Sequence, residues 1–483
     1  MYSLIRNQAT SAIKWSALGQ WATRAIQFIL LIIFARILLP QEYGAFEITI
    51  LVLSLGQIIQ DFGLSRALIQ TDSNIRIASN FVFWINLLLS VALYGLIFAL
   101  SHTISTIFNY PDLSALIKVA GFQLVITSFR SVHLALAQRE LKFRIQFISD
   151  FSGSLVTALS IVVFLLVGFR IWALIYGLLI GSVVQTIIFW LISPWRPSFQ
   201  FNTKVGRSLI RFGGYAAIES FQGWLINYGD KLIVGFLLGT EALGVYSLAF
   251  NIAVNSFSFI FQPIVSVAYS SFSRLKSDIG EIKRAYLNLV RIFALLILPM
   301  GVGLALIADP IARIVLAGRW PGITIVIQLL VLFPGISHLL LLNPELYRAI
   351  GRPDIMPRLL LITLIYSLPV FIAGAQFSLV AFVIARASVT ILFFPVHVIL
   401  LKRILDLKII LLWEQIKVPL AATMIMAIVV YGLNFGSAAI HRFPGWIQLS
   451  ALMLGGALSY CTVLWWADKE LLSSAYRLVK KTI

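Results

Sequence analysis

Residues 14–38, KWSALGQWATRAIQFILLIIFARIL, form an apolar stretch long enough to cross a lipid bilayer. A hydrocarbon core about 30 Å thick needs roughly 20 helical residues. Polar side chains nevertheless interrupt this stretch at Ser16, Gln20, Arg24 and Gln27. At about 100° per residue, these four side chains fall within roughly an 80° sector of one helix. The stretch therefore predicts a transmembrane helix with one polar face.

The whole chain has the composition of an integral membrane protein. Of its 483 residues, 60% are hydrophobic and only 12% are charged, whereas soluble domains carry about 25% charged residues. The single cysteine, Cys461, excludes an internal disulfide and a cysteine-based metal cluster. The five histidines are scattered, and none has a second histidine at ligand spacing. We therefore expect an all-α membrane protein with no metal site and no bound cofactor.

Hydropathy divides the chain into about fourteen spans, which are separated by turn sequences such as Pro40-Gln41-Glu42-Tyr43-Gly44. The predicted spans are 14–38, 45–70, 80–105, 113–138, 145–168, 171–193, 209–238, 242–272, 284–307, 323–349, 357–376, 379–401, 409–433 and 445–467. No predicted loop is long enough for a folded extramembrane domain. The function must therefore lie within the membrane.

The distribution of basic residues predicts the orientation of these spans. With the amino terminus in the cytoplasm, 25 of the 37 Lys and Arg residues fall in cytoplasmic segments. The outer turns hold only Arg36, Arg170, Arg313, Arg319 and Arg442. Because Lys and Arg concentrate in cytoplasmic loops, we expect both termini to be cytoplasmic. The net charge of +18 then reflects membrane topology and not a nucleic-acid partner.

A short motif occurs twice, about 200 residues apart. Leu38-Leu39-Pro40-Gln41-Glu42-Tyr43-Gly44-Ala45-Phe46 stands at the end of the first span, and Leu237-Leu238-Gly239-Thr240-Glu241-Ala242-Leu243-Gly244-Val245-Tyr246 stands at the end of the seventh. Both copies read Leu-Leu-x-x-Glu, then Gly, then an aromatic residue, with one extra residue in the second copy. Each block has six spans, so the two copies insert in the same direction, and transporters with such repeats bind substrate between them. We predict two six-helix lobes, 1–200 and 201–405, and a third segment, 406–483, with two additional helices and a cytoplasmic tail.

Several later spans also carry polar stripes. They comprise Glu47, Ser54, Gln57 and Asp61 in the second span, Gln123, Thr127 and Arg130 in the fourth, Glu219, Gln222 and Asp230 in the seventh, Asn251, Asn255, Ser258 and Gln262 in the eighth, and Arg291 and Arg386 in the ninth and twelfth. A charge at the bilayer centre costs about 2.5 kcal/mol or more, so it faces a partner or a wet cavity. Two interpretations stay open: a shared hydrophilic chamber, or hydrogen bonds and ion pairs that hold the helices together.

The arginines favour an anionic cargo if a chamber exists. A guanidinium is permanently charged and presents a planar fork of donors that matches phosphate or carboxylate geometry. The pattern does not distinguish pyrophosphate from carboxylate.

Four stretches of the chain resemble a known family. They are residues 13–70, LAQRELKFR at 136–144, YGDKLIVGFLLGTEALGVYSLA at 228–249 and FSRLKSDIGEIKRAYL at 272–287. In these stretches the chain resembles the polysaccharide-transport flippases of the colanic-acid and teichuronic-acid exporter type. They belong to the multidrug/oligosaccharidyl-lipid/polysaccharide superfamily. The resemblance implies a fourteen-helix bundle in the bacterial inner membrane that moves undecaprenyl-pyrophosphate-linked oligosaccharides to the outer leaflet.

For transport of such a cargo, we hypothesise the following roles for the polar residues. Arg24, Arg130, Arg291 and Arg386 would bind the pyrophosphate. Gln20, Gln27, Gln123, Asn251 and Asn255 would line the chamber and contact sugar hydroxyls. Glu47, Asp61, Glu219 or Asp230 would couple transport to H⁺ or Na⁺. Implied partners are the lipid-linked oligosaccharide, membrane lipid, and a polysaccharide polymerase with chain-length or export machinery.

Other classes of protein remain as alternatives. A cation-coupled multidrug exporter would have the same predicted architecture. The arginines in the spans of this chain argue against it, because they would repel cationic drugs. A membrane enzyme such as a polymerase or ligase would be expected to have a sizeable outer loop with acidic or His residues, and the predicted outer turns are short. No Gly-x-x-x-x-Gly-Lys phosphate loop is present. A non-transporting scaffold would have no use for so many polar stripes. We therefore predict a transporter and not an enzyme.

Overall fold

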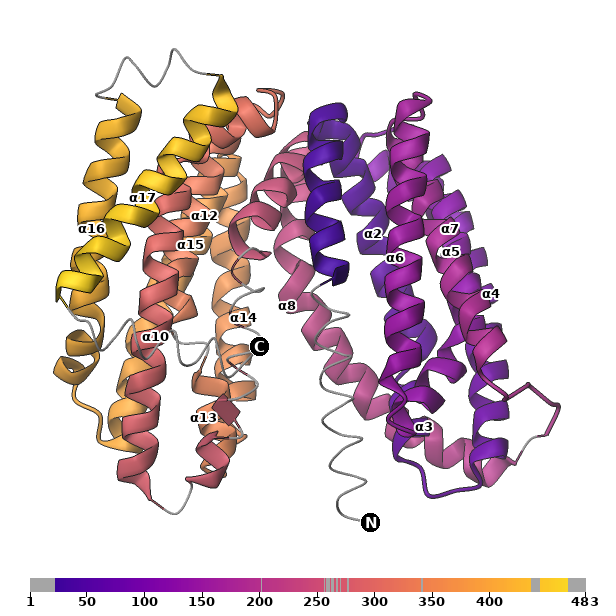
Figure 1. Cartoon of the computed structure of the whole chain (residues 1–483). Helices are drawn as coiled ribbons and strands as arrows, with labels where there is room; N and C mark the ends of the chain where they lie inside the picture. The colour runs from indigo at the N-terminus through magenta and orange to yellow at the C-terminus, as the bar shows by residue number, and fades with distance from the viewer. Residues whose placement is uncertain are drawn as a thin grey trace. The chain divides into compact units, whose positions relative to one another are not determined.

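The computed structural model describes residues 22–200, 202–255, parts of 257–275, 278–339, 342–435 and 444–467, and every regular element in them is helical. Residues 22–37 are helical and are followed by α2 (Pro40–Asp61), α3 (Leu64–Gln70), α4 (Ile75–Ile107), α5 (Leu113–Arg139), α6 (Phe143–Leu166), α7 (Ile171–Ile192), α8 (Thr203–Phe250), the π-helix η1 (Asn251–Asn255), α10 (Ile279–Leu306), α11 (Ala308–Pro310), the π-helix η2 (Ile311–Val315), α12 (Ile323–His338), α13 (Asn343–Ala349), α14 (Ile355–Ala375), α15 (Leu379–Leu405), α16 (Ile409–Phe435) and α17 (Gly445–Ala467) (Figure 1). The predicted all-α polytopic fold is confirmed.

Among the described residues, eleven helices are long and apolar enough to cross a membrane. The predicted number of fourteen stays a prediction, for three reasons. The first span begins in residues outside the described part of the chain. Helix α8 contains the seventh span and only the beginning of the eighth, which lies partly outside the described residues, and Gly239 (φ 84°, ψ 179°) leaves the helical conformation where the sequence predicted a break between the two. The tenth span, 323–349, is divided between α12 and α13, and its apolar helical part, Ile323–Phe333, is shorter than a membrane-crossing helix.

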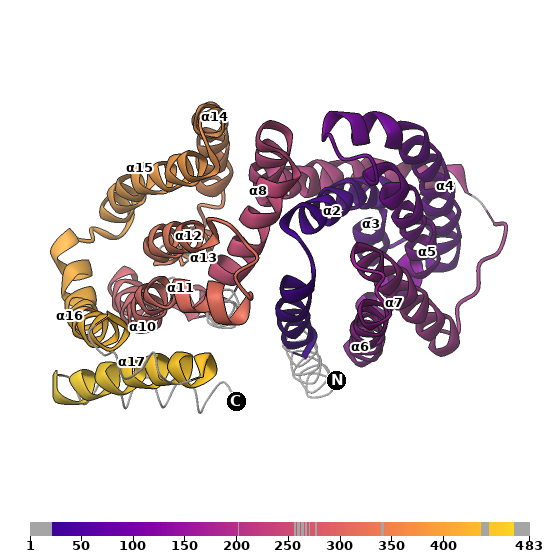
Figure 2. The same cartoon turned by 90° about the horizontal axis from the view of Figure 1, so that it is seen from above.

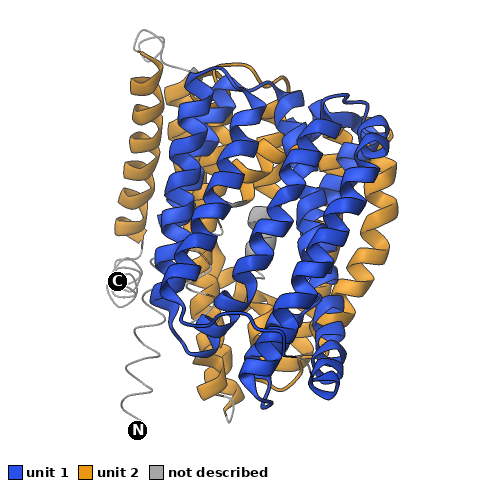
Figure 3. Cartoon of the chain, turned by 90° about the vertical axis from the view of Figure 1, so that its right-hand side faces the viewer, with its two compact units in different colours: residues 1–244 blue, residues 245–483 orange. Residues whose placement is uncertain are grey.

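The chain forms two compact units, Met1–Gly244 and Val245–Ile483, which are coloured separately in Figure 3. These units are defined by packing, whereas the lobes 1–200 and 201–405 were predicted from the repeat. In the packing-based division, most of α8 belongs to the first unit. The lobe boundaries and the separate segment 406–483 stay predictions.

In the first unit, α4, α5, α7 and α6 follow one another in a row, and α2 packs against α5 (Figure 2). Where α3, α4 and α5 meet, an apolar cluster includes Leu68, Val82, Phe83 and Val132. Lipid tails are as apolar as these side chains, so van der Waals packing holds α3, α4 and α5 together at this cluster.

In the second unit, the row is α14, α15, α12, α10, α16 and α17. The two C-terminal helices predicted at 409–433 and 445–467 correspond to α16 and α17. They share a buried cluster with α10 that includes Leu295, Met426, Leu452 and Tyr460. The Tyr460 hydroxyl donates a hydrogen bond of 2.8 Å to the Leu295 carbonyl.

The predicted second span, 45–70, is two helices. The chain leaves the α-helical conformation at Phe62 (φ 43°) and Gly63 (φ 68°), so α2 ends and α3 starts at an angle to it. Arg139, from the motif LAQRELKFR, donates hydrogen bonds of 2.8–3.0 Å to the carbonyls of Leu68, Ile69 and Thr71. Because the last carbonyls of a helix lack partners within it, Arg139 stabilises the end of α3.

Candidate functional site

A buried ion pair joins α2 to α8. The Lys231 ammonium lies 2.8 Å from a carboxylate oxygen of Glu47, and the two side chains are 9% and 8% exposed. The same ammonium lies 5.8 Å from the ring centre of Tyr228. Asp230 is also buried and accepts a hydrogen bond of 2.7 Å from the Lys231 backbone amide. The pair connects a span of the predicted first lobe with one of the predicted second lobe.

The polar stripes correctly placed Glu47 inside a span but missed its partner. Lys231 projects about 100° away from Asp230 around the helix, so it was left outside the predicted stripe of the seventh span. The signal that could have found it is simple. An acid within a span faces a partner or a wet cavity, so a lysine in another span is a candidate partner wherever it lies around its own helix.

Further polar contacts join α2 and α3 to α8 along its length. Seven residues beyond Glu47, the Ser54 hydroxyl accepts a hydrogen bond of 2.8 Å from the Trp224 indole, and Trp224 lies seven residues before Lys231. The order of contacts shows that the two helices run antiparallel. Farther along, Arg66 pairs with Glu219 at 2.9 Å, but these side chains are 52% and 76% exposed.

Among the four acids predicted for ion coupling, Asp61 contacts a residue close to it in the chain, Ser65. Its carboxylate accepts hydrogen bonds from the Ser65 backbone amide, at 3.2 Å, and from the Ser65 hydroxyl. Because the first amides of a helix lack partners within it, this carboxylate stabilises the first turn of α3. Glu47 and Asp230 are the two buried acids of the set.

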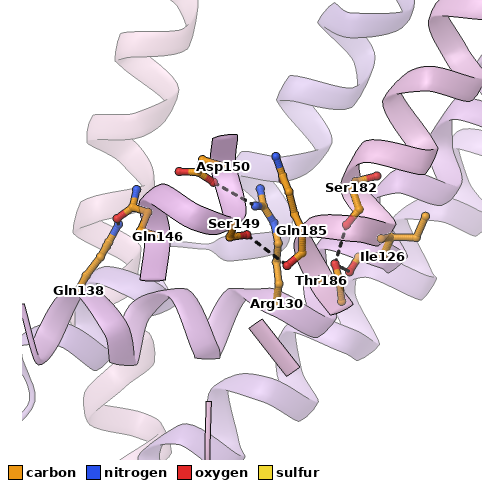
Figure 4. A network of polar contacts seen from close by, with 9 residues as sticks. All are labelled: Ile126, Arg130, Gln138, Gln146, Ser149, Asp150, Ser182, Gln185 and Thr186. Atoms are coloured by element: carbon orange, nitrogen blue, oxygen red, sulfur yellow. Dashed lines mark hydrogen bonds and ion pairs between the residues drawn. The ribbon is translucent and has the colours of Figure 1, made fainter. Parts of the chain in front are cut away.

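A second polar cluster lies among α5, α6 and α7, and Figure 4 shows it from close by. Arg130 of α5 lies 3.8 Å from the Asp150 carboxylate of α6, and the side chains are 22% and 37% exposed. Next to this pair, the Ser149 hydroxyl donates to the Gln185 carbonyl at 3.2 Å. The sequence predicted Arg130 as a binding residue and did not predict that Asp150, on the next helix, would lie beside it.

The Arg130–Asp150 distance has a chemical consequence. A charge-assisted hydrogen bond between nitrogen and oxygen is about 2.7–2.9 Å long, so 3.8 Å is an ion pair without a direct hydrogen bond. The guanidinium has five N–H donors. Arg130 can therefore bind an additional anion while it stays close to Asp150.

In the second unit, Arg386 of α15 contacts the last turn of α8. Its guanidinium donates a hydrogen bond of 2.9 Å to the buried Tyr246 hydroxyl and lies 5.0 Å from the ring centre of Phe250. Asn251 follows directly as the first residue of the π-helix η1. Such π-helical turns inside α-helices are frequent at functional sites.

The other predicted site residues differ in their exposure. Arg24, Gln123 and Arg291 are half-buried in their helices, and Gln27 is exposed. Gln20 and the side chain of Asn255 lie outside the described residues. In the part of the chain that the structure describes, no group of three or more His, Cys, Asp or Glu side chains could hold a metal ion. The chamber shared by both predicted lobes stays a prediction.

Comparison with protein families identifies the chain. A family model described as "Polysaccharide biosynthesis protein" matches residues 33–325. The chain belongs to this family. The resemblance to polysaccharide-transport flippases is thereby confirmed, and the chain is a multi-pass membrane transporter.

Relatives from several bacteria are similar over much of the chain. The teichuronic acid biosynthesis protein TuaB of Bacillus subtilis is 24% identical over 465 residues, which cover 95% of this chain and 96% of TuaB. The lipopolysaccharide biosynthesis protein WzxC of Escherichia coli is 25% identical over 68% of this chain and 67% of WzxC. The succinoglycan biosynthesis transport protein ExoT of Rhizobium meliloti is 24% identical over 68% of this chain and 66% of ExoT.

Solved structures show the same fold at low sequence identity. The lipid II flippase MurJ, in an inward closed conformation, superposes with a TM-score of 0.75 at 15% identity, covering 95% of this chain and all of MurJ. An inward-facing multidrug resistance transporter of the MATE family superposes with a TM-score of 0.61 at 14% identity, covering 79% of this chain and 95% of that one. The chain therefore shares its fold with these two transporters.

Proposed function

We propose that the protein is a flippase that moves undecaprenyl-pyrophosphate-linked oligosaccharides across the bacterial inner membrane for surface polysaccharide synthesis. The observation that carries the proposal is the placement of Arg130 and Arg386 within membrane-spanning helices of a polysaccharide biosynthesis protein. The names of TuaB, WzxC and ExoT support a cargo that is a precursor of a cell-surface polymer.

The difficulty of flipping such a molecule lies in its headgroup. A pyrophosphate and its sugars would lose their water in hydrocarbon, at a cost far above that of moving the polyprenyl tail. In our proposal, the headgroup crosses inside a chamber between the predicted lobes while the tail stays in lipid. Rocking of the lobes exposes the chamber to each side of the membrane in turn.

The described contacts refine the proposed roles of the residues. Arg130 binds phosphate through the donors that Asp150, at 3.8 Å, does not use, and Asp150 lowers the cost of the buried cation when no cargo is bound. Arg24, Arg291 and Arg386 are the other proposed phosphate ligands. Gln20, Gln27, Gln123, Asn251 and Asn255 are the proposed contacts for sugar hydroxyls.

For energy coupling, the buried acids Glu47 and Asp230 are better placed than Asp61 and Glu219. A proton or Na⁺ bound at Glu47 would weaken its attraction to Lys231 and so change the contact between α2 and α8. Both termini are proposed to be cytoplasmic, and a polysaccharide polymerase is the proposed acceptor of the flipped cargo. The proposal assigns no enzymatic reaction to the chain.

Substitution of Arg130 tests the proposal in a strain that lacks the chromosomal copy. Loss of a hydrogen bond to a charged group costs about 1.5–3 kcal/mol, so Arg130→Ala should reduce export of the polymer about 10- to 100-fold. Arg130→Lys, which keeps the charge but not the fork, should be intermediate. Arg358→Ala is a matched control, because this arginine is 75% exposed in its pair with Asp354. Wild-type export by Arg130→Ala, at equal protein level, would contradict the proposal.

The multidrug exporter is the second candidate function, because a MATE transporter shares the fold. Drug susceptibility of the deletion strain distinguishes the two. Loss of surface polysaccharide could itself change drug susceptibility, so the control is a glycosyltransferase-deficient strain that lacks the same polysaccharide. If the protein is a flippase, the deletion strain and this control strain should be equally susceptible to cationic drugs.

A further inference from the structure

The two copies of the repeated motif contact each other through glycines. A methyl group built on Gly44 would overlap the Thr240 carbonyl oxygen and lie 2.7 Å from its carbon. A methyl group built on Gly244 would overlap the Pro40 carbonyl oxygen and lie 2.8 Å from its carbon. The backbones therefore touch directly, as small residues permit in membrane helices. We call this contact, formed by Pro40, Gly44, Thr240 and Gly244, the glycine crossing.

The glycine crossing is symmetric. In each copy, the glycine contacts the carbonyl of the residue that lies four positions before the other glycine. Each methyl position is also 3.1 Å from the amide nitrogen of the opposite glycine. Such reciprocal contacts are expected where two equivalent segments meet about a local two-fold axis. The sequence repeat thus has a physical counterpart in the first unit.

Neighbouring contacts fix both sides of the glycine crossing. The Arg170 guanidinium binds Glu42, in the first turn of α2, through two hydrogen bonds of 2.6 and 2.9 Å. Glu47 lies three residues beyond Gly44, or about 5 Å along the helix, and forms the buried pair with Lys231. The first turn of α2 is thus tied to the α6–α7 connection on one side and to α8 on the other.

The segment of α8 that forms the crossing follows a helix break. Gly239 adopts φ 84° and ψ 179°, a conformation open essentially to glycine alone. A cavity of about 390 Å³ lies at this break and is lined in part by Gln41, Asn109, Gly239 and Glu241. The break separates residues 240–244, which contact α2 at the glycine crossing, from the part of α8 that carries Lys231.

We infer that the glycine crossing and the Glu47–Lys231 pair form the closed gate at the outer end of the transport path. The inference rests on the proposed function, because release of cargo at the outer face requires this contact to open. Glycines suit such a gate, since two flat backbones exclude a headgroup yet separate without disengaging side chains. The ion pair, buried in the closed state, adds a charge-dependent contribution to closure.

The gate is tested by thiol labelling from outside the cell. Cys461 is the only cysteine, so Cys461→Ser gives a thiol-free background. Thr240→Cys then places a thiol at a residue that is 7% exposed. Adding Gly44→Ala should raise its labelling by an impermeant maleimide about tenfold or more, because overlap with backbone cannot be relieved by a rotamer change.

Gly95→Ala is the matched control, because a methyl group there meets no atom within 4 Å, and labelling should stay unchanged. If Gly44→Ala does not accumulate, the double variant Glu47→Gln/Lys231→Gln opens the same gate without steric overlap and should also increase labelling. Unchanged labelling in a folded variant of either kind would overturn the gate. Polymer export in the Arg130→Ala strain is scored separately, so the gate and the proposed function can fail independently.

Discussion

The two ends of the contact between α8 and the α2–α3 segment carry ion pairs of nearly equal length and different surroundings. Glu47 and Lys231 lie 2.8 Å apart and are less than 10% exposed. Arg66 and Glu219, at the other end, lie 2.9 Å apart and are more than half exposed. The contribution of each ion pair to stability is therefore decided by its burial and not by its length.

The energetic difference follows from desolvation. Removing one member of a buried pair leaves an uncompensated charge, which costs about 3–5 kcal/mol. An exposed pair is worth about 0–1 kcal/mol, because water and salt screen it. Removal of one charge should therefore cost far more at the Glu47 end, the predicted outer side, than at the Arg66 end, the predicted cytoplasmic side.

The largest expected effect comes from Lys231→Ala. This change leaves Glu47 charged among apolar groups and should lower the free energy of unfolding by about 3–5 kcal/mol. Thermal unfolding of the purified protein in detergent measures it. The double variant Glu47→Leu/Lys231→Met removes both charges and should recover most of the loss. If Lys231→Ala were as stable as the wild type, the buried pair would not have the role assigned here.

The smallest expected effect comes from Arg66→Ala. The free energy of unfolding should fall by about 1 kcal/mol or less, and the difference should shrink at high salt. Glu219→Ala should behave in the same way in the same unfolding assay. A loss comparable to that of Lys231→Ala would show that the two ends are equivalent and would remove the asymmetry.

The sequence predicted single-helix properties well. The all-α polytopic fold, the break at Gly239 and the polar face that holds Glu47 and Ser54 depend on residues close together in the chain, and hydropathy and helical periodicity report on these. The break at Phe62–Gly63 was missed, because an apolar run of 26 residues, 45–70, reads as one span. A glycine that follows Asp61 and Phe62 was the available signal for the end of α2.

Contacts between side chains on different helices could not be predicted from the sequence in the same way. Whether Glu47 meets Lys231 or Asp230 depends on the crossing angle and the relative depth of α2 and α8, which helical periodicity does not contain. The same holds for Arg130 and Asp150, which lie on consecutive helices. The repeat was visible in the sequence, but the contact of Gly44 with Gly244 requires segments 200 residues apart to meet.

The most direct test of the central claim is flipping by the purified protein in liposomes. The substrate is an undecaprenyl-pyrophosphate-linked sugar with a fluorophore on the headgroup, and an impermeant quencher added outside reports how much is exposed. The account predicts that wild-type protein exposes the inner-leaflet pool, whereas Arg130→Ala leaves that pool protected. Equal protection with wild-type protein and with empty liposomes, or equal flipping by wild type and Arg130→Ala, would contradict it.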